Sequence, residues 1–271
     1  MWGGRTLARV AHKSLPPDVK IGETWDVWHG SVITNGQHRG QSLDALVRRA
    51  GRADGQFPLL FKYIDAHDHL SVQVHPDDQS AQMMEQHPFG KTEAWYILHA
   101  EPDAVVVHGF QHDVTVDDVR DGLARNTITD LLAMVPVRTG DVLFVPAGLV
   151  HAIGKGIVLA EIQQHSDITY RLYDWDRTDD TNRPRELHVD KALRVSDLRG
   201  LRQHTVPPLV VAHAQCEQHF LVACRYFVLE RLVVTERCAE FTLGDAAHIV
   251  SVLSGEAQFT FGPSFAWSVV A

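Results

Sequence analysis

Short β-rich runs separated by turn residues are the feature that most limits how this chain can fold. Valine, isoleucine, phenylalanine and tyrosine fill the runs, and glycine, proline, aspartate and asparagine stand between them. The regular strand–helix alternation of a parallel sheet is missing. The pattern therefore predicts an all-β dominated fold, an antiparallel sandwich or jelly roll. The predicted strands are residues 57–64, 70–75, 94–98, 104–107, 142–145, 157–162, 226–234, 248–253 and 257–261, with a turn at 254–256.

A few short helices are expected between these strands. Ser42 is a suitable N-cap for a helix over Leu43 to Ala50. Thr115 can open a second helix over residues 116–125, where Asp117 and Asp118 fall in the first turn. A third helix is expected over residues 187–195, after Arg183-Pro184-Arg185.

The chain divides into two expected units at about residue 195. Residues 1–195 hold every candidate metal ligand and form the predicted metal-binding catalytic domain with short helical insertions. Residues 196–271 are β-rich but lack a second set of ligand-like histidines, so they are predicted to form a metal-free β-sandwich unit. If this unit is truncated, we expect the last ten residues to be poorly anchored.

Composition narrows the possible partners. A net charge of −9 with no basic run argues against nucleic-acid binding, although it leaves room for a small anionic substrate. We expect no membrane association, because the apolar runs are only strand-sized and the N-terminus lacks a signal peptide. The three cysteines are odd in number and lack metal-ligand spacing, which suggests reduced thiols and a cytoplasmic protein.

Three short motifs together indicate a metal site. Gln73 and His75 share one face of a strand, Glu93 follows in the next apolar run, and His151 comes after the turn Pro146-Ala147-Gly148. Two imidazoles, one carboxylate and one amide oxygen suit a borderline divalent ion, zinc first. The set contains no thiolate, which favours a catalytic over a structural site. A rival set built on His69 and His151 stays open.

Further polar residues fall on the same strand faces. Ser71 precedes Gln73 by two residues, and Lys91 precedes Glu93 by two. The odd positions from Glu161 to Tyr173 would share one face, although a bend near residues 165–166 is expected. The alternative for these charges is a solvated surface ladder of little energetic value. Trp2 and Trp25 are expected in the core, and Arg5 and Arg177 at the surface rather than on a phosphate.

These runs resemble the type I mannose-6-phosphate isomerases in their short bacterial form. The resemblance covers most of the first 195 residues in order. It rests on Trp2-Gly3-Gly4, Gly22-Glu23-Thr24-Trp25, residues 57–60, 70–78, 90–96, 140–151, 161–174 and Pro184-Arg185-Glu186-Leu187-His188.

The resemblance implies a cupin jelly roll that interconverts mannose 6-phosphate and fructose 6-phosphate through a cis-enediol. It implies one Zn²⁺ per chain, bound by Gln73, His75, Glu93 and His151, the set already chosen from spacing. It implies catalytic roles for Lys91, Glu161, Asp167 and Arg171. It implies substrate binding by Ser71, Lys91 and Arg171. Asp167 is expected to orient Arg171. The implied partner is a small sugar phosphate, and the implied assembly is a monomer or homodimer.

Two other classes of function remain in view. A cupin oxygenase would use iron, but such sites commonly show a tighter His-x-His pair, and here Gln73 takes the first histidine position. A non-catalytic sugar-phosphate binding protein is the second alternative. It would not need Lys91, Glu161 and Arg171 beside a metal.

Overall fold

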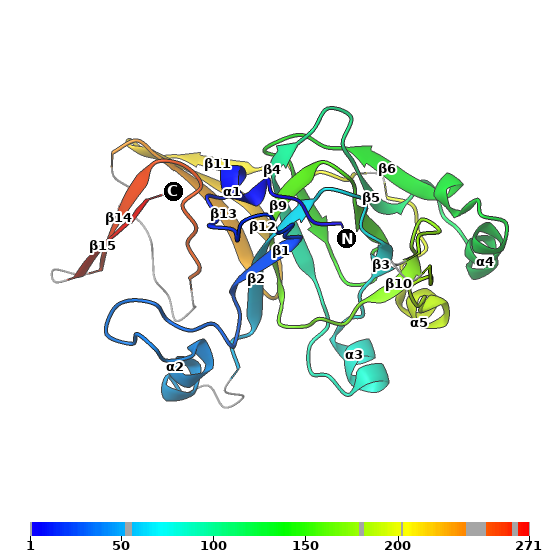
Figure 1. Ribbon diagram of the computed structural model, residues 1–271, viewed down its shortest axis with the longest axis horizontal. Coiled ribbons are helices and arrows are strands. Elements are labelled where there is room, and N and C mark those ends of the chain that lie inside the picture. The colour runs from blue at the N-terminus through cyan, green and yellow to red at the C-terminus, as the bar shows by residue number, and fades with distance from the viewer. Residues whose placement is uncertain are drawn as a thin grey trace.

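Two antiparallel sheets of five strands each face one another in the computed structural model, which describes residues 2–51, 56–178, 182–201, 203–236, 248–261 and 265–270 (Figure 1). This arrangement confirms the predicted jelly roll. The first sheet has the order β1 (Glu23–Val27), β2 (Leu59–Ala66), β9 (Ile157–Gln164), β4 (Glu93–Ala100), β7 (Val142–Val145). The second has the order β10 (Tyr170–Tyr173), β3 (Val72–Val74), β8 (His151–Ile153), β5 (Val105–Phe110), β6 (Leu132–Pro136).

The first sheet is buried on both faces, which explains why its strands are continuous apolar runs. Trp95, Ile97 and Leu159 point into the barrel interior, where they pack with residues of the second sheet. Their chain neighbours Ala94 and Val158 point outward and are covered by other segments. The outer cover includes Leu7, Leu221, Val222 and Phe227. The two-residue alternation therefore separates an inner core from an outer one.

The predicted helices form with their predicted caps. α2 (Leu43–Arg49) begins at Ser42, whose hydroxyl accepts from the Ala45 N–H. α4 (Val116–Ala124) begins at a capping box made by Thr115 and Asp118. α5 (Val189–Val195) starts two residues later than expected and packs on β10 and β3.

Two helices and several strands were not predicted. α1 (Leu7–Val10) is only one turn, and α3 (Asp78–Glu85) buries only Ala81, so neither carries an apolar stripe. A 3₁₀ turn covers Ile128–Asp130. Conversely, residues 248–253 are not a regular strand, so that prediction is wrong.

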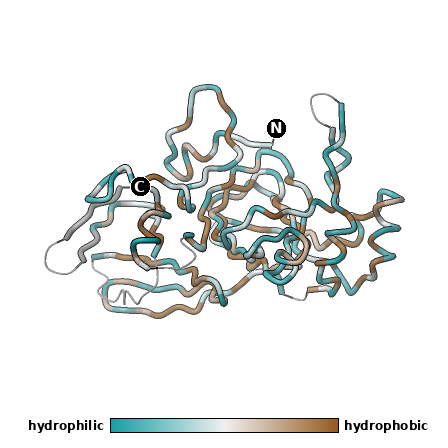
Figure 2. Tube along the Cα trace, turned by 90° about the horizontal axis from the view of Figure 1, so that it is seen from below, coloured by the Kyte–Doolittle hydropathy of each residue, from teal (hydrophilic) through white to brown (hydrophobic). Residues whose placement is uncertain are grey.

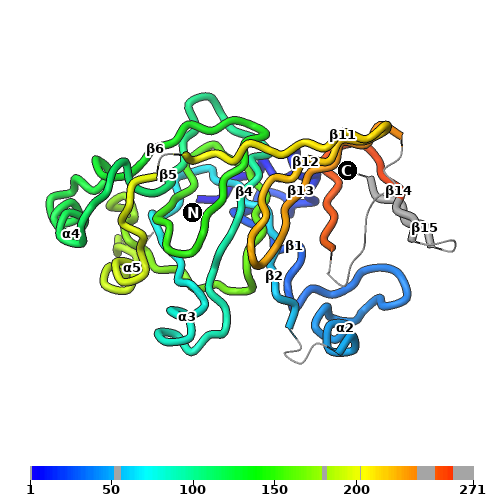
Figure 3. The backbone as a smooth tube through the Cα atoms, turned by 180° about the vertical axis from the view of Figure 1, so that it is seen from behind, coloured from blue at the N-terminus to red at the C-terminus, as the bar shows by residue number. Residues whose placement is uncertain are grey.

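The chain after residue 200 forms a three-stranded antiparallel sheet, β11 (Leu209–Ala212), β12 (Cys216–Ala223) and β13 (Val228–Val234), and a hairpin of β14 (Glu256–Phe261) and β15 (Phe265–Val270). Side chains of β12, β13 and the turn between them pack against the outer face of the first sheet (Figures 1 and 3). Hydrophobic stretches, drawn brown, gather in the central strands of the molecule (Figure 2). The division into two domains at residue 195 stays a prediction. So does the poor anchoring of the last ten residues, whose side chains lie outside the described part of the chain.

The expectation of three reduced cysteines is wrong for Cys216, which is disulfide-bonded. Cys224 is a free thiol. Among the helices that the structure describes, none has the length and apolar character needed to cross a membrane.

Candidate metal centre and substrate pocket

Three buried side chains meet between the two sheets. His75 follows β3, Glu93 opens β4 and His151 opens β8, and each is about 1% exposed. Their potential ligand atoms all lie within 4.8 Å of one another. Glu93 Oε2 is 3.5 Å from His75 Nε2, and Glu93 Oε1 is 3.4 Å from His151 Nε2. Gly148, in a left-handed conformation at φ +89°, makes the turn that returns the chain to His151.

Backbone carbonyls fix the orientation of both imidazoles. His75 Nδ1 donates to the Ile168 carbonyl at 2.8 Å, and His151 Nδ1 donates to the Leu149 carbonyl at 2.8 Å. Each ring therefore presents an unprotonated Nε2 to the centre, as a metal-binding histidine does. Burial lowers the pKa of His151 to about 3, and burial together with the nearby Lys91 lowers the pKa of His75 well below its usual value. Both rings are neutral at physiological pH and so are able to bind a metal ion.

Glu93 is a buried carboxylate that lacks ordinary hydrogen-bond donors. Neither of its oxygens has a satisfied hydrogen bond, and its ion pair is with Lys91, 2.9 Å from Oε2. Burial and the charge of Glu161 raise the pKa of Glu93 to about 7. A buried carboxylate needs a balancing cation and hydrogen-bond donors, and Lys91 reaches Oε2 but leaves Oε1 without a donor. The donor set of two imidazoles and one carboxylate thus fits a divalent metal ion.

Gln73 supplies the amide of the predicted set. It pairs with His151 across β3 and β8, and its Nε2 lies 3.4 Å from His151 Nε2. A half-turn of the amide exchanges its nitrogen and oxygen, so Gln73 can present an oxygen here. His69 lies elsewhere, with its ring tilted against Trp175 at 5.1 Å between the ring centroids, so the rival set with His151 is not assembled.

A network of buried charges adjoins the candidate metal centre. Lys91 Nζ lies 3.0 Å from His75 Nε2 and 3.9 Å from Glu161 Oε1. Lys62 Nζ lies 3.2 Å from Glu161 Oε1, and Trp95 Nε1 donates to Glu161 Oε2 at 2.9 Å. Burial would raise the pKa of Glu161, but the charges of Lys62 and Lys91 outweigh it and lower the pKa. Burial would lower the pKa of Lys62, but Glu161 and other carboxylates outweigh it and raise the pKa.

Lys62 was missed in the sequence analysis. It is the only charged residue in the apolar run of residues 57–64, which could have marked it. Its significance comes from the register of β2 and β9, where Lys62 stands opposite Glu161. Glu23 on β1 was also missed, and it lies 3.4 Å from Lys62 Nζ.

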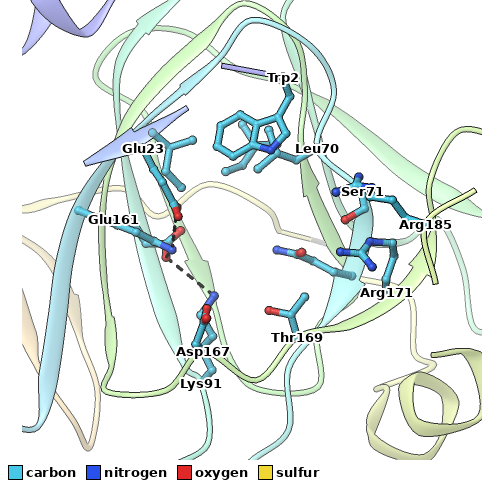
Figure 4. A pocket seen from close by; sticks show the side chains of 14 residues that line it. Trp2, Glu23, Leu70, Ser71, Lys91, Glu161, Asp167, Thr169, Arg171 and Arg185 are labelled. Carbon is cyan, nitrogen blue, oxygen red and sulfur yellow. Dashed lines mark ion pairs between the residues drawn. The ribbon is translucent and has the colours of Figure 1, made fainter. Parts of the chain in front are cut away.

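A cavity of ≈ 290 Å³ opens onto this network (Figure 4). The structure brings all five predicted active-site residues outside the metal set to its walls: Ser71, Lys91, Glu161, Asp167 and Arg171. Its other polar lining residues are Glu23, Lys62, Gln73, Thr169 and Arg185. Arg171 and Arg185 lie beside Ser71, across the cavity from Glu23 and Glu161 (Figure 4). The cavity therefore has a cationic side, and the opposite side carries lysines and glutamates that are paired with one another.

Arg171 is held differently from the expectation. The predicted bend is confirmed, because β9 ends at Gln164 and β10 begins at Tyr170. Asp167 forms no ion pair with Arg171 and lies on the Lys91 side of the cavity (Figure 4). The Glu186 carbonyl accepts from Arg171 Nη1 at 2.8 Å instead. Burial and the neighbouring Arg185 lower the pKa of Arg171.

The structure also places the two tryptophans and two arginines whose positions were predicted from the sequence. Trp2 lines the cavity rather than only filling the core. Trp25 is 36% exposed, so its placement in the core is wrong. Arg5 donates to two backbone carbonyls at the surface, and Arg177 pairs with Asp174, in agreement with the structural roles expected for both.

Comparison with known proteins gives one consistent family. The family described as phosphomannose isomerase type I, catalytic domain, matches residues 1–90. Mannose-6-phosphate isomerase ManA of Bacillus subtilis is 37% identical over 97% of this chain and 84% of its own length. Mannose-6-phosphate isomerase of Streptococcus mutans is 35% identical over the same shares. A crystal structure of mannose 6-phosphate isomerase from Bacillus subtilis superposes with a TM-score of 0.80 at 28% identity, covering 96% of this chain and 78% of that one. Relatives this similar along nearly the whole chain show that it belongs to the type I mannose-6-phosphate isomerase family.

Proposed function

We propose that this protein is a zinc-dependent isomerase that interconverts mannose 6-phosphate and fructose 6-phosphate through a cis-enediol. Its family is one of isomerases. The observation that carries the proposal is the juxtaposition of a buried His75–Glu93–His151 centre with a cavity lined by proton-carrying and cationic side chains.

Zinc would be held by His75, Glu93 and His151, with the Gln73 amide as the fourth ligand. The donor chemistry favours it, since nitrogen and oxygen ligands without thiolate are typical of catalytic zinc. A solved relative of the same fold was crystallised with zinc and yttrium. When bound, zinc supplies a positive charge that polarises the substrate oxygens and stabilises the developing enediolate. Because Glu93 is the single anionic ligand, about one positive charge remains in excess.

The chain's own groups move the proton between C1 and C2. Lys62, Lys91 and Glu161 form a connected buried network at one wall of the cavity. Glu161 is the member held unprotonated, because the two lysines lower its pKa. The ammonium groups can donate a proton to an oxygen as it gains charge. We assign proton transfer to this network as a unit.

The cationic side of the cavity suits the anionic part of the substrate. Arg171 presents a planar fork to the cavity, and Arg185 adds a second guanidinium beside Ser71. Asp174, 5% exposed, holds Arg185 through a bidentate pair. We assign substrate binding to Ser71, Lys91 and Arg171, with Arg171 placed to stabilise the enediolate and Asp167 at the opposite wall.

Lys62→Gln tests the network. The expected result is a fall in kcat of about 10²-fold, the scale for losing one positioned proton-transfer group. KM and zinc content should change little, since Lys62 belongs to neither the metal set nor the cationic side. Steady-state kinetics with metal analysis measures both. Lys155→Gln, at an exposed lysine, is the matched control. Wild-type turnover by Lys62→Gln would remove Lys62 from the mechanism.

A coupled assay for fructose 6-phosphate formation from mannose 6-phosphate tests the proposed function. The purified chain should be active, lose activity on chelation and regain it with added zinc. Binding of the sugar phosphate without turnover would instead indicate a binding protein. Iron in the purified chain together with oxygen uptake would indicate an oxygenase.

A further inference from the structure

A tyrosine from the C-terminal sheet reaches the segments that carry the metal ligands. Tyr226, just before β13, donates from its hydroxyl to Asp78 Oδ2 at 2.8 Å. Asp78 lies in the first turn of α3, directly after the strand and turn that carry His75. Its other oxygen, Oδ1, accepts from the Gly90 N–H and from Gln164 Nε2, each at 2.8 Å. One carboxylate thus joins three distant parts of the chain.

The segment that is hydrogen-bonded to Asp78 begins at Gly90 and leads directly to Glu93. Gly90 packs so closely that a Cβ there would lie 2.4 Å from the Asp77 backbone. The next N–H, of Lys91, donates to the Pro76 carbonyl at 3.0 Å. The Thr92 N–H donates to Gln164 Oε1 at 2.9 Å, and Gln164 itself is held by Asp78. The Gln164 N–H also donates to the Thr92 carbonyl at 3.1 Å, and Glu93 itself pairs with Val145 and Gln163 in the sheet. Asp78 therefore contributes, directly or through Gln164, to the hydrogen bonds that hold the segment leading to Glu93.

Two further hydrogen bonds connect these segments to the one that leads to His151. The Ala147 N–H donates to Thr92 Oγ1 at 3.3 Å, and the Gly148 N–H donates to the His75 carbonyl at 2.9 Å. These contacts join the chain just before His151 to the segments of the other two ligands. Hydrogen-bond partners beyond the metal ligands set the geometry of a site and its affinity.

We propose that Tyr226 is a positioning residue of the metal centre. Its hydroxyl fixes the Asp78 carboxylate, and through it the segment from Gly90 to Glu93. The C-terminal sheet, which supplies no ligand, thereby completes the site. This inference rests on the proposed function only in taking His75, Glu93 and His151 as zinc ligands.

Tyr226→Phe tests this proposal, because it removes one hydroxyl and keeps the ring. The expected result is a zinc dissociation constant raised by about 10-fold, the lower end for loss of an outer partner. Competition against a chromophoric chelator measures it without any assay of turnover. In the metal-free protein, hydrogen exchange of the amides from Gly90 to Glu93 should accelerate. In the zinc-loaded enzyme, kcat should fall while KM for the sugar phosphate stays within about twofold.

Tyr63→Phe is the matched control. The Tyr63 hydroxyl also bonds to the C-terminal part, at Ser251, but this contact does not involve Asp78. Each variant loses one hydroxyl contact between the jelly roll and the chain after residue 200, so a similar drop in Tm is expected for both. Only Tyr226→Phe should weaken zinc binding. Equal zinc constants in the two variants would overturn the proposal.

A double-mutant cycle shows whether Tyr226 acts through Asp78. In an Asp78→Ala background, Tyr226→Phe should have no further effect on the zinc constant. A full additional effect there would overturn the proposal. If the wild type binds zinc and Tyr226→Phe binds it with the same affinity, this inference alone fails. If the wild type does not bind zinc, the proposed function fails as well.

Discussion

Replacement of Glu93 by alanine is expected to remove essentially all turnover, with kcat/KM falling by about 10³-fold or more. Glu93 is the only anion among the proposed ligands, and it lies within 3.5 Å of both imidazoles. Its loss removes the charge that makes the centre attractive to a divalent ion. A metal acting as a Lewis acid contributes several kcal/mol to such a transition state, and about 4 kcal/mol corresponds to 10³-fold in rate.

The measurement is kcat/KM together with zinc content after dialysis. Glu101→Ala is the matched control, because Glu101 is an exposed glutamate just beyond the other end of β4. It should keep both activity and zinc. The Tm of each metal-free variant shows whether the fold is retained. An active Glu93→Ala protein with a full zinc complement would show that the ligands have been assigned incorrectly.

Replacement of Arg171 by alanine is expected to lower kcat by roughly 10²–10³-fold while zinc content and folding stay intact. The Glu186 carbonyl holds the guanidinium at the cavity wall before substrate arrives. A preorganised donor aimed at charge that appears only along the reaction path acts on turnover more than on ground-state binding. The magnitude is that of losing one oxyanion-type contact.

Steady-state kinetics of three variants checks this assignment. Arg171→Lys should recover little, since a point charge cannot reproduce the planar fork. Arg199→Ala, at an exposed arginine paired with Asp197, should behave as wild type. An increase in KM alone for Arg171→Ala would make the residue a phosphate holder. No change in either constant would make it part of a surface charge ladder.

Local patterns were sufficient to predict the jelly roll and three of the side chains that cluster in the candidate metal centre. The strands of the first sheet are short apolar runs whose two faces are both buried, so they could be recognised from composition and the turn residues between them. His75, Glu93 and His151 each sit at the start of a strand or just after its end, where two-residue alternation fixes the face.

Features that depend on contacts between distant segments could not be predicted. Lys62 becomes part of the site only because β2 pairs with β9, which places it opposite Glu161. Asp167 was expected to orient Arg171, but the loop after β9 carries it to the other wall and leaves Glu186 in that role. Tyr226 lies 148 residues from Asp78, and nothing local to either residue marks their contact.

Titration of the metal-free protein with zinc, with fructose 6-phosphate formation followed at each addition, is the most direct test of a catalytic zinc centre. The account predicts no significant activity at the start, a rise in proportion to added zinc, and a plateau at one zinc per chain. Full activity before any zinc is added, or zinc bound at the centre without activity, would contradict it.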